Sequence, residues 1–354
     1  MAAAVRQPQH HRHPINMPED VGALRRAVAR LAATQSAVRL GEAELVATEL
    51  GTNLLRHADP GGYVLYRQFG DGIELLSVDT GPGMTPHDIP SAAETVPIRR
   101  SSSRRDGGSG GLSVGLASIR RIATDFGCYS TPSGTIVLAR LHGAGPSTDG
   151  GWRFGAVNVP RKDDETSGDA WAVTAGPQLA ALLVDGLGHG DSAATAAQAA
   201  VTVFDQRPVT DPRDFLQRAH EAMRVTRGGV AAVCVIDPHN EQLTFAGIGN
   251  IAGQVIRGSD KQHLMSYPGT LGTHLPTPRI RVEHCRWPHG ATLVMASDGL
   301  RSGWRLDTYS GLLRHDPSVI AATLHRDFTR STDDACVLVV RHDDEMSRVE
   351  RDTR

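Results

Sequence analysis

The segment that most restricts the fold of this chain is residues 183–190, which read L-V-D-G-L-G-H-G. A dense apolar run ends there in an Asp-Gly turn, a pattern typical of a buried strand that leads into a loop. Such a strand holds the carboxylate of Asp185 on a rigid element and still lets it face solvent. The segment therefore favours a buried sheet with a metal ligand at the end of one strand.

Three further acidic sites have the same arrangement, each next to an apolar run of strand length: Asp169, Asp298 and the pair Asp333-Asp334. Aspartates at strand ends also make ordinary turns, so one such site alone indicates little. Four together, with no Cys or His at ligand spacing, favour a hard cation such as Mg²⁺ or Mn²⁺ over zinc.

The 354 residues are enough for two domains with separate cores. The stretch 142–150 is rich in Gly, Pro, Ser and Thr and is the natural linker. It separates a domain at 18–141 from one at 151–341. Residues 1–17 are expected to be a disordered tail and residues 342–354 a charged tail.

The first half contains a helix pattern at about residues 41–57 with an apolar stripe. Glu49, Asn53 and His57 lie four residues apart beside that stripe and so share one face. Spacing alone leaves two interpretations open: a solvated helix edge, or the lining of a site.

Two expected strands, at about 63–69 and 72–78, lead to Asp79 and a glycine turn containing Gly81 and Gly83. A polar segment at about 87–111 then ends in glycines that open a helix, among them Gly110, Gly111 and Gly115. Asp79 can accept a hydrogen bond from an adenine amino group, and glycines at a helix N-terminus free N–H groups for phosphates. The loop lacks the G-K-[ST] ending of a P-loop, and no strand directly precedes it, so neither Walker nor Rossmann nucleotide binding fits. Arginines in the polar segment could close over the phosphates or simply be solvated.

Composition excludes several classes of partner and location. The formal net charge of −2 gives no electrostatic reason to expect nucleic acid or an anionic membrane as a partner. No apolar run approaches the roughly 20 residues of a bilayer span. The four cysteines are far apart and unpaired by spacing, which favours a reduced, cytoplasmic protein.

The motifs of the second half resemble a known family. S-G-D-A-W, V-D-G-L-G-H-G, G-I-G-N-I, S-D-G-L and D-D-A-C-V-L-V-V-R follow, in order, the motifs of the metal-dependent (PPM) serine/threonine phosphatases, nearest to their bacterial sporulation and stress-response branch. The resemblance implies a four-layer α-β-β-α sandwich with two Mn²⁺ or Mg²⁺ ions.

By this resemblance Asp185 bridges both ions and acts catalytically, and the Gly186 carbonyl helps to hold one. Asp298, also catalytic, and Asp333 complete the other, while Asp169 acts directly or through water. Asp334 could replace its neighbour Asp333. His189, in the same loop, is either a proton donor to the leaving oxygen or a structural hydrogen-bonding residue.

The first half resembles the GHKL ATPase superfamily, nearest to the bacterial anti-sigma-factor and switch protein kinases, through E-L-G-T-N-L-L-R-H-A, D-T-G-P-G-M and G-S-G-G-L-S-V-G-L-A-S-I-R-R-I. The resemblance implies an α/β sandwich in which Asn53 holds Mg²⁺ on ATP, Glu49 is the base and Asp79 contacts adenine. The cofactor-binding glycines would be Gly81, Gly83, Gly110, Gly111 and Gly115. Relatives often have glycine at the position of Ser113, so binding is better supported than turnover.

Together the two resemblances predict an α+β protein that regulates partner switching. It would dephosphorylate, and also phosphorylate, STAS-domain anti-sigma antagonists. The alternative is that the first half only binds ATP, sequesters a sigma factor or an antagonist, and gates the phosphatase.

Overall fold

The computed structural model describes residues 5, 8–39, 41–58, 61–85, 110–143, 151–273 and 278–342, with the side chains of 110–114 excepted. The chain forms two compact units, one of residues 11–145 and one of residues 146–354 together with residues 1–10. No helix in the described ranges is long and apolar enough to cross a membrane.

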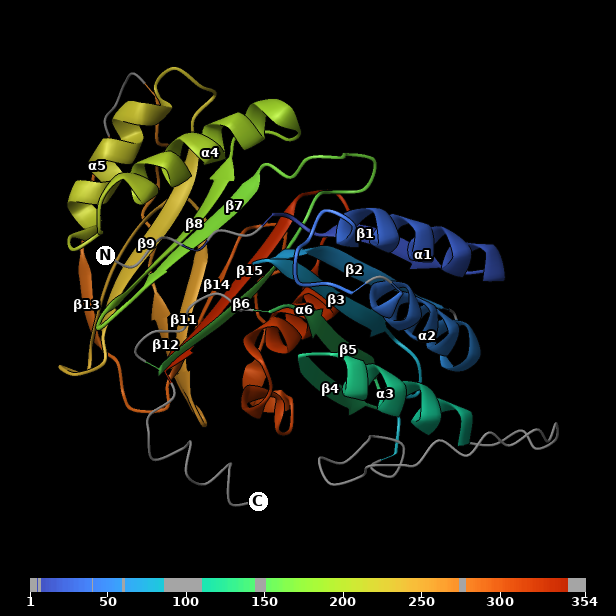
Figure 1. The fold of residues 1–354 in the computed structure, drawn as a ribbon. Coiled ribbons are helices and arrows are strands. Elements are labelled where there is room, and N and C mark those ends of the chain that lie inside the picture. The colour runs from blue at the N-terminus through green and yellow to red at the C-terminus, as the bar shows by residue number, and fades with distance from the viewer. Residues whose placement is uncertain are drawn as a thin grey trace. The chain divides into compact units, whose positions relative to one another are not determined.

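The first unit is an antiparallel sheet with helices on one face (Figure 1). The strand order is β1-β2-β3-β5-β4. The strands are β1 (His11–Ile15), β2 (Gly62–Phe69), β3 (Gly72–Asp79), β4 (Asp125–Thr131) and β5 (Gly134–Leu141). The helices are α1 (Pro18–Ala32), α2 (Glu42–His57) and α3 (Gly110–Ile122). Buried aliphatic side chains of the three helices pack on alternate positions of the sheet, which gives the unit its core.

Helix α1 begins where its sequence predicts, because Pro18 presets the backbone of the first turn. The carboxylate of Asp20 accepts hydrogen bonds from the N–H groups of Asn16 (2.8 Å) and Met17 (2.9 Å). These bonds lower the pKa of Asp20 and satisfy donors at the helix start. Leu24 and Val28 of this helix are fully buried in the core.

An ion cluster lies on the other face of the same sheet. Glu74 stands between its cross-strand partners Arg67 and Arg140, at 2.7 Å from each. The three residues are no more than 5 % exposed. Buried charges persist only when paired, so the cluster fixes the register of β2, β3 and β5. The sequence pattern gave no signal for it.

The second unit consists of two five-stranded antiparallel sheets. One has the order β13-β10-β9-β8-β7, with strands β7 (Asp169–Ala175), β8 (Leu179–Gly186), β9 (Gly229–Asp237), β10 (Gln242–Ile248) and β13 (Glu283–Arg286). The other has the order β12-β11-β14-β15-β6, with strands β6 (Trp152–Val159), β11 (Ala252–Arg257), β12 (Asp260–Leu264), β14 (Thr292–Ala296) and β15 (Ala335–His342).

The helices of this unit cover the outer faces of the sheets, so the four-layer order expected from the sequence is confirmed (Figure 1). Helices α4 (Asp191–Gln206) and α5 (Pro212–Met223) lie on the first sheet, and α6 (Pro317–Phe328) lies on the second. Short 3₁₀ turns at Leu306–Thr308 and Leu312–Arg314 precede α6.

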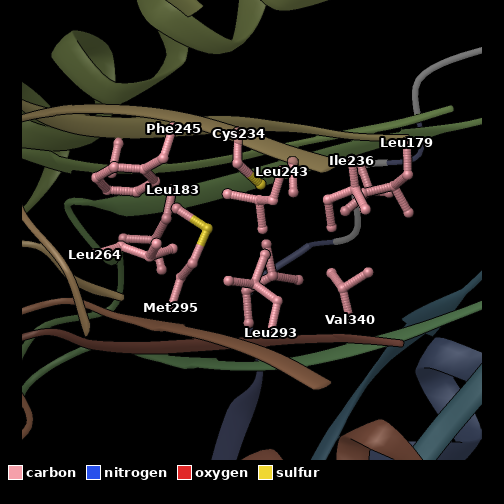
Figure 2. Packing of buried hydrophobic residues seen from close by; sticks show 14 of the residues in the cluster. Leu179, Leu183, Cys234, Ile236, Leu243, Phe245, Leu264, Leu293, Met295 and Val340 are labelled. Carbon is pink, nitrogen blue, oxygen red and sulfur yellow. The ribbon is translucent and has the colours of Figure 1, made fainter. Parts of the chain in front are cut away.

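The space between the sheets is filled by apolar side chains from both. Figure 2 shows Leu183, Leu243 and Phe245 of the first sheet facing Leu293 and Met295 of the second. Each is fully buried, which explains why these strands read as nearly continuous apolar runs. This core holds the strand ends, and therefore the acidic residues, in fixed positions.

The expectation of a disordered tail over residues 1–17 is wrong for the residues that the structure describes. His11–Ile15 forms β1 and pairs with β2, and Val5 forms a β-bridge with Val173. Both contacts use the open edge of a sheet, where unpaired N–H and C=O groups accept another strand. A sequence pattern does not reveal which edges will be open.

Strands β4, β12 and β13 also lie outside the sequence expectations, because none of them carries an apolar run, and β12 and β13 are largely exposed. The predicted polar loop up to residue 109, most of the linker (144–150) and the tail from 343 lie outside the described residues. The four cysteines are buried free thiols.

Candidate functional site

Two of the predicted acidic residues lie side by side on neighbouring strands. Asp169 begins β7, Asp185 is the residue before the last of β8, and the two are cross-strand partners in the antiparallel ladder. Gly186 follows at the end of β8, where its N–H donates to the Gly168 carbonyl at 3.1 Å. The register of two strands thus brings together carboxylates that lie 16 positions apart in the sequence.

The second sheet supplies the other acidic residues. Asp298 follows β14, and Asp333 and Asp334 directly precede β15, which is the partner of β14. Ser297 joins the two sheets, because its hydroxyl donates to Asp169 Oδ2 at 2.6 Å and accepts from the Cys336 N–H at 2.9 Å. The sequence analysis missed Ser297, although it stands in the S-D-G-L motif.

The carboxylates of this cluster are close enough to raise one another's pKa values by charge repulsion. Burial raises the pKa of Asp185 to about 8, with further contributions from Asp298, Asp333 and Asp334. Burial and the neighbouring Asp185 raise the pKa of Asp169 well above its usual range, and burial and Asp298 raise that of Asp333. Several buried acids that resist ionisation together are stable as carboxylates only beside a compensating positive charge.

These side chains are not yet arranged as ligands, since no group of three or more His, Cys, Asp or Glu in the described ranges stands ready to hold an ion. Hydrogen bonds explain why: Ser297 holds Asp169, and Asn250 Nδ2 donates to Asp298 Oδ2 at 2.7 Å. A small rotation of a carboxylate exchanges one hydrogen bond for an ion, and the like charges of the cluster favour that exchange. The donor set, all oxygen and anionic, fits Mg²⁺ or Mn²⁺.

The structure separates the neighbours Asp333 and Asp334. Both oxygens of Asp334 are used by the backbone: Oδ1 accepts from the Arg161 N–H at 2.8 Å and Oδ2 from the Gly168 N–H at 2.7 Å. Asp334 is 3 % exposed. Asp333 is more exposed, and the structure gives its side chain one hydrogen bond, from the Asp334 N–H. Asp334 therefore holds a loop, while Asp333 is the better placed of the two to bind a cation.

Replacing each of the two with asparagine should give different results. Asp334→Asn turns an amide N–H₂ toward a backbone donor, and we expect a loss of about 2 kcal/mol in unfolding free energy. That corresponds to a fall in melting temperature of roughly 4–8 °C for a domain of this size. Asp333→Asn should leave the melting temperature of the metal-free protein unchanged and weaken Mn²⁺ binding. Thermal unfolding and Mn²⁺ titration check this, and the reverse pattern would exchange the two roles.

His189 lies in the loop after β8 and is oriented by a second acid. Its Nδ1 is 2.9 Å from Asp164 Oδ2, which also accepts from Arg161 Nε at 2.8 Å. The hydrogen bond from Arg161 lowers the pKa of Asp164. The His189 side chain is half exposed, so an imidazole held through Nδ1 presents its other edge toward solvent. This arrangement is compatible with both roles proposed for His189.

In the first unit, Asp79 is held rigidly at the end of β3. Its Oδ1 accepts from the N–H groups of Gly81 (2.8 Å) and Thr135 (3.1 Å). Gly83 has φ = +78°, and a Cβ there would lie 2.2 Å from the Thr131 carbonyl oxygen, so only glycine fits. The D-T-G-P-G turn thus fixes one carboxylate oxygen and keeps the backbone beside it free of side chains.

The structure also brings together Glu49, Asn53 and Gly115, from α2 and α3. A Cβ on Gly115 would lie 2.7 Å from Glu49 Oε2 and 3.4 Å from Asn53 Oδ1. The Asn53 Nδ2 atom is buried and has no hydrogen-bond partner in the described part of the chain. A buried N–H donor without a partner is costly, and this one can donate to a phosphate oxygen, while the Oδ1 atom of the same amide can contact a cation. Together with α3, which begins at Gly110-Gly111, this donor set fits Mg²⁺–ATP.

Comparisons with known proteins agree with this division. Residues 16–141 match the family model of the histidine kinase-like ATPase domain, and residues 175–343 match that of stage II sporulation protein E (SpoIIE). A search of curated proteins gave no match.

Solved structures also resemble parts of this chain. A structure described under "The bacterial stressosome: a modular system that has been adapted to control secondary messenger signaling" is 26% identical, covers 54% of this chain and 99% of its own, and has a TM-score of 0.50. RsbX in complex with magnesium is 19% identical over 54% of this chain and 96% of its own, with a TM-score of 0.48. The PP2C phosphatase domain of SpoIIE from Bacillus subtilis, with a fragment of its regulatory domain, is 17% identical over 76% and 79%, with a TM-score of 0.45.

Each family match falls within one of the two compact units, and each unit has its own cluster of polar residues. The chain therefore joins a domain of the histidine kinase-like ATPase type to a domain of the SpoIIE phosphatase type.

Proposed function

We propose that this protein is a partner-switching regulator whose SpoIIE-type domain removes phosphate from a serine or threonine of a STAS-domain antagonist, and whose ATPase domain binds Mg²⁺–ATP and phosphorylates the same kind of partner. The observation that carries the phosphatase proposal is the meeting of acidic strand ends from two sheets: Asp169 with Asp185, and Asp298 with Asp333. The unpartnered amide of Asn53 beside Glu49 supports the nucleotide proposal.

In the phosphatase domain, Asp185 and the Gly186 carbonyl would hold two cations, with Asp298 and Asp333 on one and Asp169 acting directly or through water. Two divalent cations, when bound, supply a hydroxide nucleophile at neutral pH and neutralise the phosphoryl oxygens. Phosphate monoesters hydrolyse extremely slowly without a catalyst, so the site must lower a very large barrier. His189, which contacts Asp164 in the loop after β8, would give a proton to the leaving serine oxygen, or would serve only as a structural hydrogen-bonding residue.

In the ATPase domain, Asp79 would accept a hydrogen bond from the adenine amino group, and the N-terminus of α3 would hold the phosphates. Asn53 would contact Mg²⁺ on the triphosphate. Glu49, one turn earlier on α2, would take the proton from the serine or threonine hydroxyl of the partner. The sequestering function is the alternative to this last step, and Ser113 favours it.

The experiment supplies STAS-domain proteins from the same genome to the Asp298→Asn protein with labelled ATP and then adds wild-type protein. Label should accumulate on one serine or threonine and disappear in the chase. If STAS proteins bind but are not labelled, while separately phosphorylated ones are still hydrolysed, the first domain is a binding module. If phosphorylated STAS proteins are not hydrolysed, the proposed substrate is wrong.

A further inference from the structure

Residues that precede the first domain in the chain belong structurally to the phosphatase unit. Val5 forms an antiparallel bridge with Val173, with N–H···O distances of 2.6 Å and 3.0 Å. Strand β7, which contains Val173, is the edge of its sheet. The bridge therefore covers backbone groups on β7 that the sheet itself leaves unpaired.

Gln9 and His10 continue from there to the loop that leads into β7. The Ser167 N–H donates to Gln9 Oε1 at 2.7 Å, and Gln9 Nε2 donates to the Glu165 carbonyl. The His10 N–H donates to the Asn158 carbonyl at 2.7 Å, and His10 Nδ1 accepts from the Asn158 N–H at 3.3 Å. His10 is fully buried, so this is a packed contact and not a loose tail.

The two residues held in this way, Asn158 and Ser167, in turn hold Asp169. Asn158 Nδ2 donates to the Asp169 carbonyl at 2.8 Å. Ser167 Oγ donates to Asn158 Oδ1 at 2.8 Å and accepts from the Asp169 N–H at 3.1 Å. Asn158, Ser167 and Asp169 are all at most 5 % exposed. The backbone of Asp169 is therefore fixed by a buried polar network, one side of which is supplied by Gln9 and His10.

We propose that Gln9 and His10 are positioning residues for the metal-binding carboxylate of Asp169, an inference that rests on the metal site of the proposed function. Residues beyond the ligands orient them through hydrogen bonds, and in buried networks each bond depends on its neighbours. Without the side chains of Gln9 and His10, the N–H groups of Ser167 and Asn158 lose their acceptors. Ser167 and Asn158, which hold the backbone of Asp169 by hydrogen bonds, are then less firmly held themselves. The next residue, His11, begins β1 of the ATPase domain.

The test uses full-length protein with two variants that remove the contacts, Gln9→Met and His10→Leu. His10→Asn is the conservative variant, since its side-chain oxygen can replace Nδ1 as acceptor. The control is His11→Leu, an adjacent exposed histidine whose ring stacks on Tyr66, 5.2 Å between centroids. The measurements are Mn²⁺ affinity by calorimetry, amide hydrogen exchange over residues 158–169, and melting temperature in EDTA.

We expect both removal variants to weaken Mn²⁺ binding by about 10-fold, at the lower end of the range for residues beyond the ligands. Exchange at Ser167 and Asp169 should accelerate, while the global melting temperature in EDTA moves little. His10→Asn should recover most of the affinity, and His11→Leu should match wild type. Gln9 is only partly buried, so Gln9→Met keeps the test valid if His10→Leu does not fold.

Wild-type Mn²⁺ affinity and wild-type exchange in Gln9→Met and the folded histidine variants would overturn the proposal. A failure of the proposed function is distinguishable, because wild-type protein itself would then bind no Mn²⁺ and hydrolyse no phosphoester. In that case unchanged exchange over residues 158–169 would still refute the positioning role.

Discussion

Replacing Asp185 with asparagine is expected to lower phosphatase activity by at least about 10³-fold and leave the protein folded. A bound cation contributes several kcal/mol to the transition state, and each 1.36 kcal/mol corresponds to a factor of ten in rate. The carboxylates of Asp298, Asp333 and Asp334 all raise the pKa of Asp185, so Asp185 lies close to the other acidic residues of the site. Activity on a small aryl phosphate, measured with Mn²⁺ or Mg²⁺ and again in EDTA, checks the prediction.

The same variant should behave differently from wild type without any substrate. In EDTA at a pH above about 8, where the Asp185 carboxyl is ionised, Asp185→Asn removes one of several like charges from a buried site, so its melting temperature should equal or exceed that of wild type. Added Mn²⁺ should stabilise wild type and not the variant. Asp260→Asn, at an exposed carboxylate of β12, is the matched control and should keep activity and metal response. Full activity of Asp185→Asn would refute the metal assignment.

Mg²⁺–ATP is expected to raise the melting temperature of the first domain, and Asp79→Asn to remove most of this effect. A ligand at 100 times its Kd stabilises the native state by about 2.7 kcal/mol, a shift of roughly 10 °C for a domain of this length. Asp79 presents a carboxylate fixed by the N–H groups of Gly81 and Thr135. Loss of a charge-assisted hydrogen bond to the adenine amino group should weaken binding by about 10- to 100-fold.

Scanning calorimetry with ATP and GTP measures this, and GTP should give little shift because guanine has a carbonyl where adenine has an amino group. Gly115→Val is a second variant, in which the new side chain would meet the Glu49 carboxylate and block the site. Glu19→Gln, at an exposed position of α1, is the control. If millimolar Mg²⁺–ATP does not shift wild type, the nucleotide site is wrong or disabled.

The amino-acid pattern was enough to predict the buried strands and the acidic candidate residues. The apolar runs before Asp185 and Asp298 demanded burial on both faces, which a two-sheet sandwich provides. The polar face of α2 was visible from spacing, and in the structure Gly115 lies against Glu49 and Asn53 of that face. Local patterns sufficed here because each signal lies within one element.

The way those elements meet could not be predicted from local patterns. The pairing of Asp169 with Asp185 depends on strand register, and the different hydrogen bonding of Asp333 and Asp334 depends on the loop that contains Arg161 and Gly168. The pairing of Val5 and of residues 11–15 depends on open edges of β7 and β2, and these edges exist only once the sheets have formed. Composition made that segment resemble a tail, because the hydrogen bonds that order it come from residues far away in the sequence.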